Sequence, residues 1–220
     1  MSRQELSATM HSGYGSRISK LIDPESLPAL WRNTPIEELI GAHNFDKPIE
    51  SGDTPQLLIV SCIEYRFSPQ VPHSFAYVAR KAGSRLIGEE FSLAYTVAKG
   101  VKHIALIGHN DCGMTKVNQA KPALIEALVS QGWDKTAATL YVNANAPSHM
   151  IGDELESLEQ EYLRLRSLFK KVLIAPLFVS IASSHLHIPN WYAKYAAQAG
   201  KDEDTDTPVS LDKIAELLRL

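Results

Sequence analysis

The sequence predicts an α/β fold built on a central, mainly parallel four-stranded sheet. Short apolar runs rich in β-branched residues are typical of buried parallel strands, and they occur at residues 57–60, 74–79, 104–107 and 172–181. Helical spacing separates several of these runs, and polar residues follow two of them directly. We expect an antiparallel edge strand over residues 185–192, flanking helices and an amino-terminal helical arm.

The segment before the third of these strands is expected to be a helix that crosses over the sheet. Residues 89–99 have helical spacing, with a set of side chains predicted to pack on the sheet: Phe91, Leu93, Tyr95, Val97 and Ala98. A strand–helix–strand unit crosses over right-handedly and keeps both strands pointing the same way. The strand ends then share the carboxyl edge, where open α/β sheets carry their sites, and this edge should hold Cys62, His109 and Cys112.

Two thiolates and one imidazole at one sheet edge indicate a zinc site. Cys62 and Cys112 are the only cysteines of the chain, and His109 lies three positions before Cys112. A disulfide or a pair of buried, unreactive thiols are the alternatives. Three protein ligands would leave a fourth position of Zn²⁺ open for water, which is typical of catalytic sites.

The chain divides into three parts by pattern. Residues 1–50 form the amino-terminal helical arm, residues 51–200 the zinc-binding α/β core, and residues 201–220 an acidic linker with a carboxy-terminal helix. In the arm, residues 26–32 and 35–43 are short helix candidates, too short to be stable alone, so they must dock on this sheet or on a partner subunit. Of these two, we expect them to wrap a partner subunit. Further helices are predicted at residues 121–131 and 153–169, whereas residues 132–149 read as irregular.

Composition excludes several classes of partner. A net charge of -3 over 220 residues gives no basic surface for nucleic acid, and no apolar stretch is long enough to span a bilayer. The amino terminus lacks the apolar core of a signal peptide, and its serines and arginines resemble an organelle transit peptide only faintly. We therefore expect a cytoplasmic protein.

The motifs at the two strand ends resemble those of the beta-class carbonic anhydrases. Cys62-x-Glu64-x-Arg66 and His109-x-x-Cys112-Gly113 are similar to the family's usual Cys-x-Asp-x-Arg and His-x-x-Cys patterns. Residues 79–84 resemble its Arg-Asn-Ala-Gly-Asn segment, and residues 92–104 resemble its crossover helix and the strand that follows. The likeness extends from about residue 55 to residue 115.

This resemblance implies a function and a set of site residues. It implies reversible hydration of CO₂ to bicarbonate by zinc on Cys62, His109 and Cys112, in a homodimer or homotetramer. Glu64 and Arg66 would be catalytic, with the arginine holding the acid that orients the attacking hydroxide. The resemblance also implies a substrate pocket formed by Tyr77, Ala82, Gly83, Tyr95 and Gly113.

Glu64 is where the sequence departs from the family, which has aspartate there. The added methylene moves the carboxylate by roughly 1 Å, a misplacement that can lower a rate by about 10²-fold, so we expect an attenuated activity that Glu64→Asp would raise. Glu64 could be held by Arg66, or it could reach the zinc and close the site. The alternative functions are a related zinc hydrolase of COS or CS₂, and a zinc-binding protein without catalysis.

Overall fold

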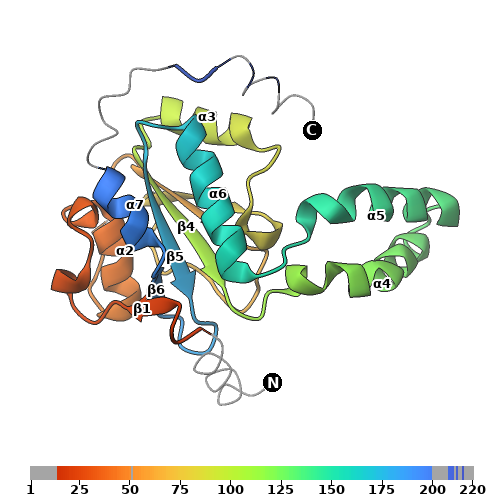
Figure 1. Cartoon of the computed structure of the whole chain (residues 1–220), viewed down its shortest axis with the longest axis horizontal. Helices are drawn as coiled ribbons and strands as arrows, with labels where there is room; N and C mark the ends of the chain where they lie inside the picture. The colour runs from red at the N-terminus through yellow and green to blue at the C-terminus, as the bar shows by residue number, and fades with distance from the viewer. Residues whose placement is uncertain (1–13, 51, 200–207, 211, 213–214, 216–220) are drawn as a thin grey trace.

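The chain forms a six-stranded sheet in the order β1-β6-β5-β4-β2-β3, as a computed structural model shows (Figure 1). The structure describes residues 14–50, 52–199, 208–210, 212 and 215. The transit-like serines before residue 14, the acidic linker and most of the carboxy-terminal helix candidate lie outside the described residues. The strands are β1 (Ile18–Lys20), β2 (Leu57–Ser61), β3 (Ala76–Arg80), β4 (His103–His109), β5 (Leu173–Val179) and β6 (Leu186–Pro189).

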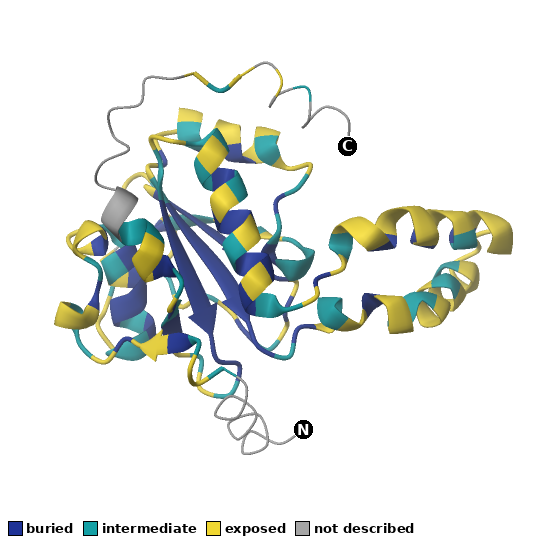
Figure 2. Ribbon diagram, in the orientation of Figure 1, coloured by how far each residue is buried: buried dark blue, intermediate teal, exposed yellow. Residues whose placement is uncertain are grey.

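The four predicted parallel strands are neighbours in the sheet, with β3 at one of its edges. β2 pairs in parallel with both β3 and β4, and β4 pairs in parallel with β5. Every residue of β2 is buried, as are all but the first residue of β4 and β5 (Figure 2). Continuous apolar runs of this kind are what a strand covered on both faces requires. The prediction of a mainly parallel α/β fold is confirmed.

The predicted antiparallel strand is β6, and a further strand covers it. β6 pairs with β5 on one side and with β1 on the other, antiparallel in both cases. β1 lies in the segment that the sequence assigned to the helical arm. Its three residues are too few to show a strand periodicity, and its backbone is held from outside by Asn190, whose N–H donates to the carbonyl of Arg17 at 2.9 Å.

The helices of the arm dock on the sheet of their own chain. Helix α2 (Pro35–Asn44) follows two 3₁₀ turns (Pro24–Ser26 and Ala29–Trp31) and packs on β4 and β6. The side chains that belong to the same buried core as the sheet are Trp31, Ile36, Leu39 and Ile40. The indole N–H of Trp31 also donates to the Tyr192 hydroxyl at 3.0 Å, in helix α7 (Tyr192–Ala199). The apolar face of this arm is thus satisfied within one subunit.

Helix α3 (Glu90–Ala98) exists as predicted, but a different face packs on the protein. Its buried residues are Leu93 and Thr96, whereas Phe91 is 85% exposed and Tyr95 54% exposed. Leu93 is two positions from both Phe91 and Tyr95, and residues at that spacing do not share one face of a helix, so burying Leu93 leaves the other two outside. The expectation that Phe91 and Tyr95 pack on the sheet was therefore wrong.

Two helices project from the body as an antiparallel hairpin (Figure 1). α4 (Val117–Ser130) includes all of the predicted helix at 121–131 except its last residue, and α5 (Lys135–His149) occupies most of the segment 132–149 that was expected to be irregular. Asp134 caps α5 by accepting a hydrogen bond from the Ala137 N–H at 2.9 Å. The buried positions of α5 include two alanines, Ala138 and Ala146, and such small residues give almost no hydrophobic periodicity.

Helix α6 (Glu154–Leu168) confirms the clearest helical pattern of the sequence. It packs on β4 and β5 with a buried stripe that includes Leu155, Leu158, Tyr162 and Leu165. Asp153 caps it by accepting hydrogen bonds from the N–H groups of Leu155 and Glu156, both at 3.0 Å. No helix in the described part of the chain is long and apolar enough to cross a membrane.

A matched pair of leucine variants tests the docking of the arm. Leu39 is 0% exposed and Leu30 is 36% exposed, so the two truncations differ in the core volume that they remove. We expect Leu39→Ala to lower the free energy of unfolding by about 2–5 kcal/mol, and Leu30→Ala to change it far less. Urea unfolding followed by circular dichroism measures both. Equal, small effects would show that the arm does not belong to the core.

Candidate metal centre

Three ligand-type side chains meet at the carboxyl edge of the sheet. Cys62 directly follows β2, His109 is the last residue of β4, and Cys112 begins the turn beyond it. In the register of the sheet Ser61 lies opposite Ile107, so the ends of β2 and β4 are neighbours. All three side chains are buried, and their ligand atoms lie within 4.8 Å of one another. The sequence predicted this grouping, and the structure brings it together.

The spacing of the two sulfurs fits a shared metal ion. The Sγ atoms of Cys62 and Cys112 are 3.8 Å apart, and both cysteines are free. Two sulfurs that are each about 2.3 Å from a tetrahedral zinc lie roughly 3.8 Å from each other. The chain therefore offers this pair as thiolate ligands, and the two cysteines do not form a disulfide.

The His109 ring is oriented to present its Nε2 atom. Its Nδ1 lies 3.0 Å from the carbonyl oxygen of Asn110, which can only accept, so Nδ1 carries the proton. Nε2 is buried and has no hydrogen-bond partner among the described residues. An unpartnered buried nitrogen is costly unless something binds it, and a metal ligand is the ordinary use of an imidazole held in this way.

Hydrogen bonds favour ionisation of Cys62 over Cys112. The contact with the Cys112 thiol lowers the pKa of Cys62 to about 4 against the effect of burial, with further help from His109 and from the Gly83 N–H, which donates to Sγ at 3.2 Å. The same thiol contact and burial raise the pKa of Cys112. A thiolate is the form that binds metal, so Cys62 is already prepared as a ligand.

Glu64 is held beside this group by Arg66. The Arg66 guanidinium donates to both carboxylate oxygens of Glu64, from Nε to Oε1 at 2.8 Å and from Nη2 to Oε2 at 2.7 Å. The backbone N–H of Arg66 adds a third bond to Oε1 at 2.8 Å. These side-chain hydrogen bonds, with the charge of Arg66, lower the pKa of Glu64. Of the two arrangements open from the sequence, the structure has the pairing with Arg66.

Arg66 also binds a second carboxylate that the sequence reasoning missed. Its Nη1 donates to Oδ2 of Asp111 at 2.8 Å, and its Nη2 donates to the backbone carbonyl of Asp111 at 3.1 Å. Asp111 has a positive φ of 55°, which turns the chain between His109 and Cys112. Its place inside the His-x-x-Cys motif was the available signal. Asp111 fixes the guanidinium that in turn fixes Glu64.

The backbone at Cys112 is supported from the amino-terminal segment. The Cys112 N–H donates to Oε1 of Glu154 at 3.2 Å, and Oε2 of Glu154 accepts from the Tyr14 hydroxyl at 2.9 Å. Arg17 binds the neighbouring Asp153 through both guanidinium nitrogens, at 2.7 and 2.8 Å. The bonds of Tyr14 and Arg17 join residues 140 and 136 positions apart, and the bond from Cys112 to Glu154 joins residues 42 positions apart, so no local pattern in the sequence could indicate them.

Apolar side chains from the base of the α4–α5 hairpin close one side of the centre. Ile151 is buried against Cys62 and Cys112, and Met114 packs on the same cluster. The N–H of Ile151 donates to the carbonyl of Met114 at 3.2 Å, which joins the two ends of the hairpin next to the sulfurs. The metal group therefore has an apolar wall beside its sulfurs, and Glu64, held by Arg66, lies next to His109.

The predicted pocket residues divide into two groups. Gly83 contacts Cys62 through its N–H, Ala82 precedes it in the same 3₁₀ turn, and Gly113 directly follows Cys112. Tyr77 and Tyr95 instead line a cavity of about 300 Å³ between β3 and α3, whose described lining contains none of the three ligand residues. The role of the two tyrosines in a substrate pocket stays a prediction.

Comparison with solved structures finds the same architecture in beta-carbonic anhydrases. A beta-carbonic anhydrase of Trichomonas vaginalis superposes with a TM-score of 0.53 at 18% identity, covering 74% of this chain and 99% of that one. A carbonic anhydrase of Glaciozyma antarctica has a TM-score of 0.49 at 20% identity over 75% of this chain and 96% of that one. A carbon disulfide hydrolase has a TM-score of 0.48 at 16% identity over 64% and 81%.

The first of these matches shows that the chain has the beta-carbonic anhydrase fold. The resemblance in the motifs of the sequence is thereby confirmed at the level of the fold, with the Cys-His-Cys group at the expected place. No family model matches the chain, and no curated protein matches it in sequence.

Two histidines at opposite ends of one strand test the metal centre. We expect one metal ion per chain, its loss in His109→Ala and in Cys112→Ser, and full occupancy in His103→Ala, which changes the other end of β4. Loss should also lower stability, because zinc binding of this strength is worth on the order of 10 kcal/mol. Elemental analysis and thermal unfolding of purified protein measure both. A full metal content in the double variant His109→Ala, Cys112→Ser would disprove this centre.

Proposed function

We propose that this protein is a zinc-dependent carbonic anhydrase that hydrates CO₂ reversibly to bicarbonate. The observation that carries the proposal is the buried Cys62, His109 and Cys112 group with a clamped carboxylate beside it. The donor set of two sulfurs and one nitrogen suits zinc and leaves one position for a fourth ligand. Bound there, zinc would make water a nucleophile at neutral pH by lowering its pKa to about 7.

Glu64 has one lone-pair site that can still accept a hydrogen bond. A carboxylate has about four lone-pair sites. Oε1 already accepts two hydrogen bonds from Arg66 and Oε2 accepts one, so one site on Oε2 stays open. Oε2 is also the oxygen nearer His109, 3.8 Å from its Nδ1. In the proposed reaction this site accepts a hydrogen bond from the attacking water and so directs its lone pair at the carbon of CO₂.

The negative charge of Glu64 supports the same role, which is to orient the attacking water. Arg66 keeps Glu64 ionised, because losing the charge would cost the guanidinium hydrogen bonds. Glu64 is buried, and an ionised carboxylate accepts hydrogen bonds but has no proton to donate. Glu64 would therefore position the nucleophile and would not act as an acid. Asp111 shares the guanidinium and restricts its movement.

The apolar wall fits a small linear substrate without hydrogen-bond donors. Ile151 and Met114 offer contact but no polar group to one side of the centre. CO₂, COS and CS₂ share that shape, so assays with COS and CS₂ belong beside the CO₂ assay. Turnover of only these sulfur compounds would replace the proposed substrate, and no turnover by zinc-loaded protein would favour a binding role without catalysis.

We infer that the protein is a homo-oligomer. Its subunits would meet through a face formed by Val78, Phe91 and Tyr95, which we call the β3–α3 face. β3 is an edge strand with one side unpaired, and these three exposed apolar side chains rim the cavity of about 300 Å³. A sheet edge that is exposed in one subunit and flanked by aromatic side chains is typical of a surface that a second subunit covers. A homodimer would bury it.

Two free cysteines also support the inferred cytoplasmic location, because thiols persist in reducing compartments.

The carboxylate of Glu64 can be tested with a variant of equal size. We expect Glu64→Gln to lower the CO₂ hydration rate by about 10²-fold, because the amide cannot keep both guanidinium bonds and the acceptor site together. Asp111→Asn keeps the Glu64–Arg66 pair and should cost less. Stopped-flow hydration at equal zinc content measures the rates.

The outcomes of this assay separate several arrangements. Glu64→Gln at the wild-type rate would remove Glu64 from the reaction. Glu64→Asp should be slower than wild type if Arg66 positions the longer side chain correctly, because the shorter one withdraws the oxygen by roughly 1 Å. A faster Glu64→Asp variant would mean that the glutamate is displaced from the best position.

A charge placed on the β3–α3 face tests the assembly. We expect Phe91→Glu to convert the native oligomer into monomers, because a carboxylate would have to be buried without a partner. Leu140→Glu introduces the same charge at an exposed leucine of α5 and should leave the assembly unchanged. Sedimentation velocity measures both variants. Native protein that stays monomeric at all concentrations would contradict the inferred interface.

A further inference from the structure

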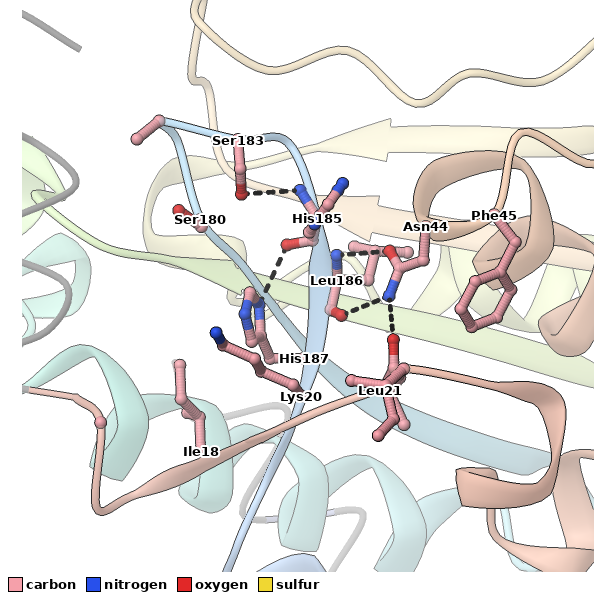
Figure 3. Close-up of a pocket in the computed structure, with 13 residues that line it drawn as sticks. Ile18, Lys20, Leu21, Asn44, Phe45, Ser180, Ser183, His185, Leu186 and His187 are labelled. Atoms are coloured by element: carbon pink, nitrogen blue, oxygen red, sulfur yellow. Dashed lines mark hydrogen bonds between the residues drawn. The ribbon is translucent and has the colours of Figure 1, made fainter. Parts of the chain in front are cut away.

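A second cavity lies at the β1–β6 edge of the sheet, next to the turn after β5. Its volume is about 630 Å³, within the range of small-molecule sites. Figure 3 shows its walls, which come from three parts of the chain that are distant in sequence: the β1 segment, the end of α2 and residues 180–187. None of the metal-group residues lines it.

The walls of this cavity are fixed by hydrogen bonds. Asn44 accepts from the Leu186 N–H at 2.9 Å and donates to the carbonyls of Leu186 and Leu21 at 2.8 and 3.2 Å (Figure 3). The N–H groups of Ser183 and Ser184 donate back to the carbonyl of Ser180, which closes the turn. The cavity is therefore largely formed before any ligand enters.

Lys20 gives the cavity a positive charge without a counter-ion. Lys20 lies opposite His187 in the β1–β6 register, and Figure 3 shows the two side chains next to each other. Lys20 forms no ion pair with any described residue, and the described residues that line the cavity include no carboxylate. A negatively charged ligand would supply the missing partner.

His187 gives the cavity a hydrogen-bond acceptor. The ring is 7% exposed, and its Nδ1 lies 3.2 and 3.1 Å from the carbonyls of Phe178 and His185, so Nδ1 carries the proton. Nε2 has no partner among the described residues, yet it is not among the atoms sealed from solvent, so it is open to the cavity. Burial lowers the pKa of His187, and the charges of His185 and Lys20 lower it further, which keeps Nε2 a bare acceptor.

The rest of the lining is apolar and would contact a hydrocarbon chain. The side chains concerned are Ile18, Leu21, Phe45 and Leu186. We propose that this cavity binds a small aliphatic hydroxycarboxylic acid. Lys20 pairs with the carboxylate, Nε2 of His187 accepts the hydrogen bond of the hydroxyl group, and the aliphatic part lies on the apolar side chains. No covalent step is involved.

Three probes of nearly equal shape separate the contributions. 2-Hydroxyhexanoate carries both groups, hexanoate lacks the hydroxyl, and hexane-1,2-diol lacks the carboxylate. Isothermal titration calorimetry of the zinc-loaded protein should give a Kd below about 1 mM for 2-hydroxyhexanoate, and binding about tenfold weaker or worse for each of the other two.

Variants of the two residues assign the preferences. Lys20→Met should abolish the preference for 2-hydroxyhexanoate over the diol, while Lys135→Met, an exposed lysine of α5, should leave it intact. His187→Asn keeps a donor for the backbone carbonyls but lacks Nε2, so it should abolish the preference over hexanoate. Circular dichroism confirms that each variant is folded.

Three results would overturn the proposal. The first is wild-type protein that binds 2-hydroxyhexanoate no more tightly than hexane-1,2-diol. The second is an affinity for 2-hydroxyhexanoate that is unchanged in both Lys20→Met and His187→Asn, since the acid would then bind elsewhere, the metal centre included. Loss of the affinity in Lys135→Met as well would also count against it, because the attraction would then be general and not local.

Discussion

The parallel pairing of β2 with β4 is the constraint on which the site depends. Because Ser61 lies opposite Ile107, β2 and β4 end side by side, and the residues that follow the two strands lie in one small volume. A shift of one residue would turn alternate side chains to the other face and separate Cys62 from His109. The buried apolar residues of both strands hold this register, so the hydrophobic core, and not the metal group itself, places the ligands.

The charges beside the metal group are balanced by one guanidinium. Glu64 is almost enclosed, and a carboxylate removed from water is costly unless it is paired and hydrogen-bonded. Arg66 provides both conditions and carries Asp111 as well, so two carboxylates and one arginine form a unit with fixed geometry. The planar fork of arginine makes this sharing feasible, which a lysine could not do from one nitrogen. The glutamate at position 64 keeps a fixed position because the guanidinium of Arg66 binds both of its carboxylate oxygens.

Local patterns predicted the centre of this protein well, and long-range contacts limited the rest. The parallel strands, α6 and the Cys62–His109–Cys112 grouping follow from apolar runs and from the position of polar residues after them. Strand β1 and helix α5 were missed because three residues show no periodicity and small buried alanines show little. Tyr77 and Tyr95, which the resemblance places in the substrate pocket, line a cavity between β3 and α3, and their role in binding stays a prediction. The support of Cys112 by Glu154 and Tyr14 depends on contacts that only the folded chain creates.

This last support has a consequence for synthesis. Glu154 follows Cys112 by 42 positions, whereas its own partner Tyr14 lies 140 positions before it. All three ligand side chains therefore leave the ribosome before the residue that holds the loop of Cys112. The loop can reach its final form only after α6 has emerged and met the segment made first. Until then the two thiols are exposed on a growing chain, and a reducing environment has to keep them available for the metal.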